Sequence, residues 1–194
     1  MFSKVNTQTL ILVPMAVAIN MALGQVASSL QLPIFLDSLG TILTAILGGP
    51  LLAMITGGLT NLMWGLLGAP TVIFFTPVAM MIGLTAGLLA QRGGFRNPVR
   101  AAISGVLISI ALAFIAVPIR TYVFGGVTGS GIDFLTGYLM MTGRELFSAV
   151  LVSVITGNIA DKVISAVVVS LIIQRLPERL ICSFSGYTLL KPNA

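Results

Sequence analysis

Residues 156–162 read TGNIADK and place an amide, a carboxylate and an ammonium inside the last long apolar segment of the chain. Charged side chains at membrane depth are costly, and they are usually retained for binding, transport or proton movement. In a helix, Asn158, Asp161 and Lys162 occupy positions i, i+3 and i+4 and therefore share one stripe. Two interpretations are open. The stripe belongs to a binding site, or Asp161 and Lys162 only neutralise each other near the membrane interface.

The composition around this stretch is that of a membrane protein. Of the 194 residues, 57% are apolar and only 8% are charged, and the mean hydropathy is +1.08. Soluble domains carry about 25% charged residues, so we expect an all-α integral membrane protein in which residues 1–194 form a single transmembrane domain.

The charged and nucleophilic residues exclude several classes of function. Ten Lys and Arg against five Asp and Glu give a net charge of +5, which we attribute to membrane topology and not to nucleic-acid binding. Histidine is absent and Cys182 is the single cysteine. This removes disulfides, Cys/His metal sites and histidine-based acid–base chemistry. The sequence therefore predicts neither an enzyme nor a bound cofactor.

Turn signals divide the apolar sequence into six expected transmembrane helices. The spans are residues 9–30, 34–48, 51–67, 72–90, 101–119 and 146–176, with an outer loop over 121–145 that has room for a short helix. Within that loop, residues 124–131 read FGGVTGSG. They lack the Lys-Ser/Thr ending and the preceding strand of a phosphate-binding loop, so we interpret them as a flexible loop or lid.

Six spans place both chain ends on the same side, and the positive-inside rule predicts that this side is cytoplasmic. Seven of the ten positive residues then face the cytoplasm: Lys4, Arg92, Arg96, Arg100, Arg175, Arg179 and Lys191. The other three, Arg120, Arg144 and Lys162, fall in the outer half together with Asp133, Glu145 and Asp161.

The depth of polar residues in the expected spans indicates a common layer. From Asp161 to Leu176 a helix rises about 22 Å of a hydrocarbon core about 30 Å thick, so Asp161 lies in the outer part of the membrane. Polar residues near the outer ends of other spans reach the same level. The predicted substrate-binding residues are Asn158, Asp161, Lys162, Arg120, Tyr122, Asn61, Trp64, Asp37 and Arg144. Trp64 fits an interfacial anchor or a stacking surface for a ring-shaped ligand.

The first expected helix carries small residues on one face. Ala18 and Ala22 are four positions apart, a spacing that lets another helix approach closely, although ordinary packing within the chain fits as well. Asn20 lies in the middle of the same span and needs a hydrogen-bond partner there.

Taken together, these motifs make nearly the whole chain similar to the substrate-binding S component of energy-coupling-factor (ECF) vitamin transporters, a class of ABC transporter. Six short helices in about 190 residues form part of the resemblance. The motifs are Ala18-x-x-x-Ala22 in the first helix, Asn158-x-x-Asp161-Lys162 in a last helix closing at Leu176-Pro177, and the segments Leu36-Asp37-Ser38-Leu39-Gly40, Leu47-Gly48-Gly49-Pro50 and Thr60-Asn61.

The resemblance implies a multi-pass protein of the bacterial cytoplasmic membrane that captures a vitamin-like molecule from outside. It also implies docking on a transmembrane coupling subunit driven by two ATPase subunits, followed by toppling of the loaded protein. In this family Asn158, Asp161 and Lys162 correspond to pocket residues, and Ala18 and Ala22 to the contact with the coupling subunit. The ligand stays open among pyridoxine-like, hydroxymethylpyrimidine-like, riboflavin, pantothenate and cobalamin molecules.

Three other functions compete with this interpretation. A self-sufficient secondary carrier could use Asp161 or Glu145 as a proton or ion site, but residues 1–97 and 98–194 show no internal repeat of the kind common in such carriers. An intramembrane enzyme lacks a paired catalytic carboxylate signature. A structural packing subunit leaves the outer polar layer unexplained.

Overall fold

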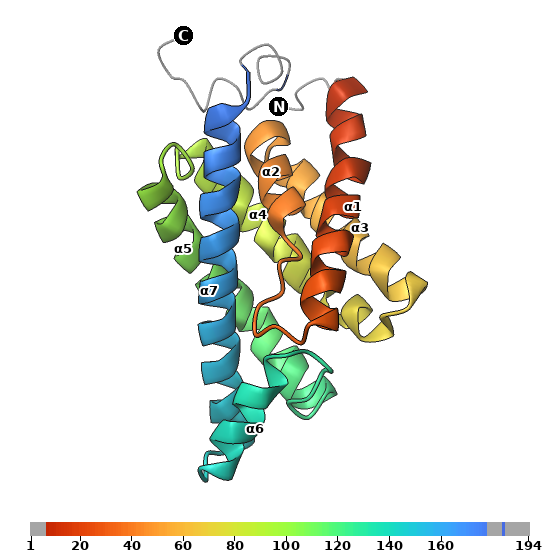
Figure 1. Cartoon of the computed structure of the whole chain (residues 1–194), viewed down its shortest axis with the longest axis vertical. Helices are drawn as coiled ribbons and strands as arrows, with labels where there is room; N and C mark the ends of the chain where they lie inside the picture. The colour runs from red at the N-terminus through yellow and green to blue at the C-terminus, as the bar shows by residue number, and fades with distance from the viewer. Residues whose placement is uncertain (1–6, 178–183, 185–194) are drawn as a thin grey trace.

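Helices joined by short connections make up nearly all of the structure (Figure 1). The computed structural model describes residues 7–177 and residue 184, and within them the chain forms no strand. The elements in order are α1 (Thr7–Ser29), α2 (Leu39–Gly48), α3 (Pro50–Leu67), the 3₁₀-helix η1 (Pro70–Phe75), α4 (Thr76–Gln91), α5 (Pro98–Pro118), the π-helix η2 (Ile119–Val123), α6 (Asp133–Met141) and α7 (Leu146–Arg175).

In the described part of the chain, five helical stretches are long and apolar enough to cross a membrane. They are Ile11–Ser29, Pro50–Leu67, Pro70–Gln91, Pro98–Val123 and Leu146–Arg175. The structure therefore confirms an all-helical chain suited to a membrane. The six predicted crossings are not confirmed, because α2 has only ten residues and rises about 15 Å.

The difference from prediction lies at the start of the second expected span, 34–48. Residues 30–38 are not helical, and they run from the lower end of α1 in Figure 1 back to the start of α2 near the middle of the molecule. Pro33 disfavours the helical conformation of the residue before it, and Leu36 has a φ of 53°, which a helix does not contain. The predicted span is therefore part extended segment and part helix.

The two ends of the bundle differ in charge. The start of α1, the α4–α5 connection and the end of α7 lie together at one end, and α6 lies at the other (Figure 1). Arg92, Arg96, Arg100 and Arg175 belong to the first of these ends and are exposed. Lys4, Cys182, Arg179 and Lys191, together with the predicted positions of both chain termini, lie outside the described residues.

Small residues bring the helices into close contact. A Cβ added to Gly57 would lie 2.3 Å from the carbonyl oxygen of Ala79, so α3 and α4 touch backbone to backbone. A Cβ on Gly105 would lie 2.7 Å from the carbonyl oxygen of Lys162, which sets α5 equally close to α7. The segment that carries Asn158, Asp161 and Lys162 is thus held rigidly against α5.

Asn20 ties the first three helices together. Its Nδ2 donates to the hydroxyls of Thr41 (2.9 Å) and Thr60 (3.1 Å), and its Oδ1 accepts from the backbone N–H of Gly40 (2.7 Å). The side chain is fully buried, and these bonds supply the partners that its mid-membrane position requires. Asn20 is therefore a structural residue of the α1–α2–α3 unit.

Candidate functional site

A cavity of about 310 Å³ lies in the half of the bundle away from the arginine-rich end. Its walls come from parts of α1, α3, α4, α5 and α7, from residues 32–38, from η1 and the turn before it, and from the loop between η2 and α6. Six predicted site residues line it: Asp37, Asn61, Trp64, Arg120, Asn158 and Lys162. Asp161 stands directly behind Lys162, whereas Tyr122 and Arg144 are not part of the wall.

Lys162 is almost completely buried, with 1% of its surface exposed. Its Nζ donates to Asp37 Oδ1 (3.1 Å) and to the hydroxyl of Ser38 (2.8 Å), and it forms an ion pair with Asp161. An ammonium group has three N–H donors, so these three acceptors use all of them. Lys162 therefore shapes the cavity wall and has no donor left for a ligand.

Asp161 holds the non-helical segment against α7. Its Oδ1 accepts the backbone N–H of Leu36 (2.7 Å) and that of Phe35 (3.3 Å), while its other oxygen binds Lys162. Non-helical backbone is tolerated at membrane depth where it is buried in protein or lines a cavity, and residues 32–38 meet that condition. The left-handed conformation of Leu36, unusual for a bulky residue, is fixed by this hydrogen bond. Asp161 and Lys162 neutralise each other, as one interpretation of the sequence had it. They also support the wall of the cavity, as the binding-site interpretation had it.

Asp37 presents a carboxylate oxygen towards the cavity. Its side chain is 25% exposed, its Oδ1 binds Lys162, and its Oδ2 accepts no hydrogen bond from the described residues. The Asp37 side chain and the Trp64 ring both pack against Gly24, where an added Cβ would lie 2.5 Å from the ring and 3.3 Å from the Cβ of Asp37. A carboxylate and an indole thus stand side by side in the wall.

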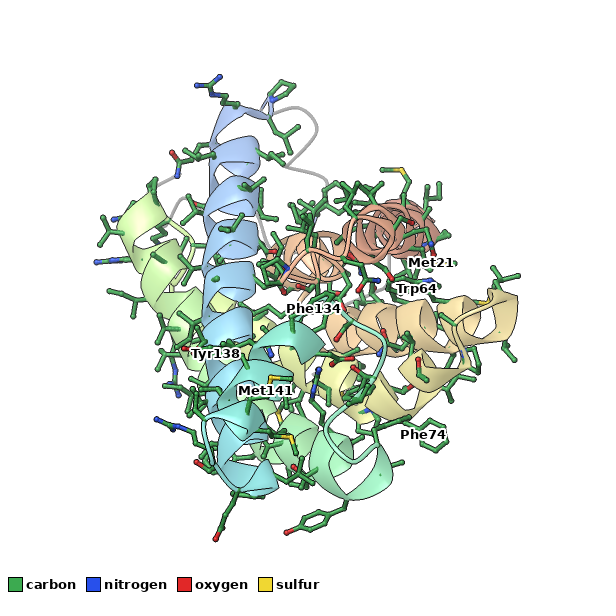
Figure 2. The ribbon with its side chains drawn as sticks, turned by 60° about the horizontal axis from the view of Figure 1, so that its bottom comes forward. Met21, Trp64, Phe74, Phe134, Tyr138 and Met141 are labelled. Atoms are coloured by element: carbon green, nitrogen blue, oxygen red, sulfur yellow. The ribbon has the colours of Figure 1, made fainter. Side chains whose placement is uncertain are left out.

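Trp64 lies on the side of α3 that faces α1 (Figure 2). Its Nε1 donates to the side-chain oxygen of Gln25 on α1 (3.2 Å), which fixes the orientation of the ring. The residue is half-buried and lines the cavity. This position fits the stacking-surface interpretation of Trp64.

Arg120 and Asp133 fold the glycine-rich loop over the cavity. Arg120 is 3% exposed, forms an ion pair with Asp133 and donates from Nε to the carbonyl of Gly126 (3.3 Å). Asp133 Oδ2 accepts the backbone N–H groups of Thr128 (2.9 Å), Gly129 (2.7 Å) and Ser130 (3.1 Å). The segment predicted as a flexible loop or lid contains this hydrogen-bonded turn, and its residues 128–131 line the cavity.

The loop also touches the segment that precedes α2. A Cβ on Gly131 would lie 2.2 Å from the carbonyl oxygen of Gln31 and 2.3 Å from that of Leu32, so the two backbones are in direct contact. Only glycine fits at this crossing. Residues 30–38 and the loop around residues 124–132 thus close the same end of the cavity from two sides.

Two asparagines face the cavity with unsatisfied groups. Asn61 is 4% exposed, and its amide forms no hydrogen bond with any residue in the described ranges. Asn158 is 6% exposed; its Nδ2 donates to the Val154 carbonyl (2.8 Å), and within the same ranges its Oδ1 has no donor. Among the described residues, the buried side-chain atoms that lack a partner are the hydroxyls of Thr121 and Ser165 and not these amide atoms. Both amides therefore open onto the cavity, where they can bond to a polar occupant.

Tyr122 and Arg144 lie away from the cavity. Tyr122 is 78% exposed. Residues two apart in a helix point in different directions, and the side chain of Arg120 points inward. Arg144 is exposed on the short connection between α6 and α7. Tyr122 and Arg144 were selected by their depth in the membrane, but depth does not determine whether a side chain points into the cavity.

Sequence reasoning did not select Asp133, Ser38 or Gln25 as site residues. Asp133 had a usable signal, since an aspartate just after a Gly-Ser-rich segment often caps the turn before it. Ser38 stood beside Asp37 in a segment of the resemblance, but its partner Lys162 is far away in the sequence. Gln25 carried no signal, because its partner Trp64 is also remote. Among the described residues no group of three or more His, Cys, Asp or Glu side chains could hold a metal ion.

Comparisons of the chain with protein-family models, curated proteins and solved structures find no match.

Proposed function

We propose that this chain is the substrate-binding S component of an ECF-type vitamin transporter in a bacterial cytoplasmic membrane. The observation that carries the proposal is the cavity. It is about 310 Å³ in volume, at the lower end of the range for small-molecule sites, and it stands in an otherwise apolar helical bundle. Buried amides without partners and a partly exposed carboxylate face it, which is the arrangement expected of a binding site for a small polar molecule.

The distribution of charge supports capture from outside. The exposed residues Arg92, Arg96, Arg100 and Arg175 lie at the end of the bundle away from the cavity. Short segments rich in Arg and Lys favour the cytoplasmic side, so the cavity belongs to the outer half of the membrane. A solute from outside then reaches the site without crossing the bilayer.

The chain has surfaces suited to partners that supply energy. No Walker A sequence occurs in it, so ATP hydrolysis belongs to separate subunits. Ala18 and Ala22 are exposed on α1, on the side opposite Asn20, and no other helix of the described residues covers them. Small exposed residues four apart allow close approach of a second helix, as docking on a coupling subunit requires.

Reconstitution separates this function from that of a self-sufficient carrier. The purified chain is placed in proteoliposomes alone or together with a coupling subunit and two ATPase subunits, and accumulation of a candidate vitamin is measured. We expect binding by the chain alone, and accumulation only in the presence of the full module and ATP. Gradient-driven accumulation by the chain alone would overturn the proposal in favour of a secondary carrier.

A further inference from the structure

The structure points to the chemical class of the ligand: we propose that the cavity selects a flat nitrogen heterocycle that is neutral or cationic and carries N–H donors, and that Asp37 rejects anions. This inference rests on the proposed binding function and narrows it. Three independent observations lead to it: the charge balance of the wall, the supply of hydrogen-bonding groups, and the aromatic surface.

The charged side chains at the cavity carry one negative charge in excess. They form two bonded groups, Asp37–Lys162–Asp161 and Arg120–Asp133, which contain three carboxylates and two cationic groups. The second group is balanced, so the excess belongs to the first. Lys162 is enclosed between its two carboxylates, and Asp37 is the more exposed of these. A cationic ligand balances this charge in a site of low dielectric, whereas an anion adds to it.

The hydrogen-bonding groups that remain free at the cavity include both acceptors and donors. All three donors of Lys162 are used within the protein. The free acceptors are Asp37 Oδ2, Asn158 Oδ1 and the amide oxygen of Asn61, as judged over the described residues. The free donors in the described structure are Asn61 Nδ2 and Arg120 Nη1, since Arg120 uses Nε and Nη2 to bind the loop. The cavity therefore matches a ligand with N–H or O–H donors for the three free oxygens and with acceptors for Asn61 and Arg120.

Aromatic side chains give the cavity flat walls. Phe35, Trp64 and Phe75 line it, and Phe75 is itself stacked on Phe124 with ring centroids 5.6 Å apart and an interplanar angle of 16°. Rings held in this way favour a planar ligand, and they favour a cationic ring most. The volume of about 310 Å³ suits one small ring system and is too small for a macrocycle. Among the candidates that the sequence left open, cobalamin is thus too large and pantothenate has the wrong charge.

Matched ligand pairs test the charge rule directly. The probes are pyridoxamine against 4-pyridoxate, nicotinamide against nicotinate, and 4-amino-5-hydroxymethyl-2-methylpyrimidine against its 5-carboxylate analogue. Binding to the purified protein is measured by calorimetry. Native mass spectrometry of the same preparation identifies any small molecule that is carried through purification. We expect at least one neutral or cationic member to bind at least tenfold more tightly than its carboxylate partner, and any carried molecule to be a neutral or cationic heterocycle.

Variants show whether Asp37 is the origin of this preference. Asp37→Asn keeps the size of the side chain and leaves Lys162 neutralised by Asp161, so the protein is expected to fold. The substitution should lower the affinity for the preferred neutral or cationic ligand at least tenfold. It should also reduce the ratio between the affinities for that ligand and for its carboxylate analogue. The matched control is Glu145→Gln, which removes an exposed carboxylate outside the cavity. It should change neither the affinity for the preferred ligand nor the affinity ratio within the ligand pair.

The outcomes distinguish the ligand class from the binding function. Tighter binding of a carboxylate member, a carried anion, or an unchanged preference in Asp37→Asn would overturn the proposed class and leave a binding protein with a different specificity. Failure of every probe to bind, together with no carried molecule, would overturn both this inference and the proposed function.

Discussion

The Nζ of Lys162 lies 3.1 Å from Oδ1 of Asp37, a residue 125 positions earlier in the chain. This contact joins α7 to the non-helical segment before α2 and completes a buried group with Asp161. It also assigns different tasks to the two carboxylates. Asp161 is fully buried and holds backbone N–H groups, whereas Asp37 keeps one oxygen free at the cavity. Substitutions in this group should therefore separate folding from binding.

Lys162→Ala should destabilise the protein by about 3–5 kcal/mol, because it leaves two carboxylates close together and without their cation. Thermal unfolding of the ligand-free protein in detergent measures this effect. Lys162→Ala/Asp161→Asn removes one of the two remaining charges and should regain part of the loss. An unfolding temperature equal to that of the wild type in Lys162→Ala would show that the ammonium is not the structural centre of this group.

Asn20 and Asn61 form a matched pair of buried amides with opposite roles. Asn61→Leu breaks no internal hydrogen bond seen in the described structure, so the unfolding free energy should stay within about 1 kcal/mol of the wild type while ligand affinity falls about tenfold. Asn20→Leu leaves the Gly40 N–H without its acceptor and should cost about 1–3 kcal/mol of stability. Chemical denaturation and calorimetry on both variants measure these values. Equal effects of the two substitutions on stability would contradict the distinction.

Much of the cavity wall was predictable because a helix advances by a constant distance per residue. Counting from the ends of the apolar segments placed Asn61, Arg120 and Lys162 at one depth, and all three line the cavity. Residues two apart in a helix point in different directions, so Arg120 and Tyr122 could not both face the cavity. Which of the two faces it was not predictable, because α5 passes into a π-helix at Ile119 and the register there depends on packing.

The second predicted span differs from the structure for a related reason. The hydropathy of residues 34–48 shows that they are apolar. It does not show that residues 34–38 are non-helical. Pro33 was a visible signal against a helix, whereas the left-handed Leu36 depends on a hydrogen bond that its backbone N–H donates to Asp161, 125 positions away. The partners of Lys162 and Asp161 in this segment could not be read from the sequence, since nothing local to α7 specifies them.

Asp133→Ala should loosen the loop around residues 124–132. The substitution removes the acceptor of three backbone N–H groups and the counter-ion of Arg120. Charge-assisted hydrogen bonds contribute about 1.5–3 kcal/mol each, so the loop should lose protection against hydrogen exchange and ligand affinity should fall at least tenfold.

Tyr122→Ala is the control for this experiment, because Tyr122 is next to the same loop but exposed and outside the cavity wall. It should leave both exchange and affinity unchanged. Normal exchange protection of residues 126–131 in Asp133→Ala would show that the turn is held by other contacts.

Ala18→Trp should abolish assembly with a coupling module and leave ligand affinity unchanged. Ala18 is exposed on the outer face of α1 and is not part of the cavity wall, so a large ring there blocks close helix approach without altering the site. Leu107→Trp is the matched control, since Leu107 is also exposed, on α5, and the same ring should be accommodated by lipid. Co-purification of the tagged variants with the coupling subunit and the two ATPase subunits measures assembly. A complex that forms equally well with both variants would remove Ala18 from the docking surface, and loss of assembly in both would show that the added bulk acts through the fold instead of through a specific face of α1.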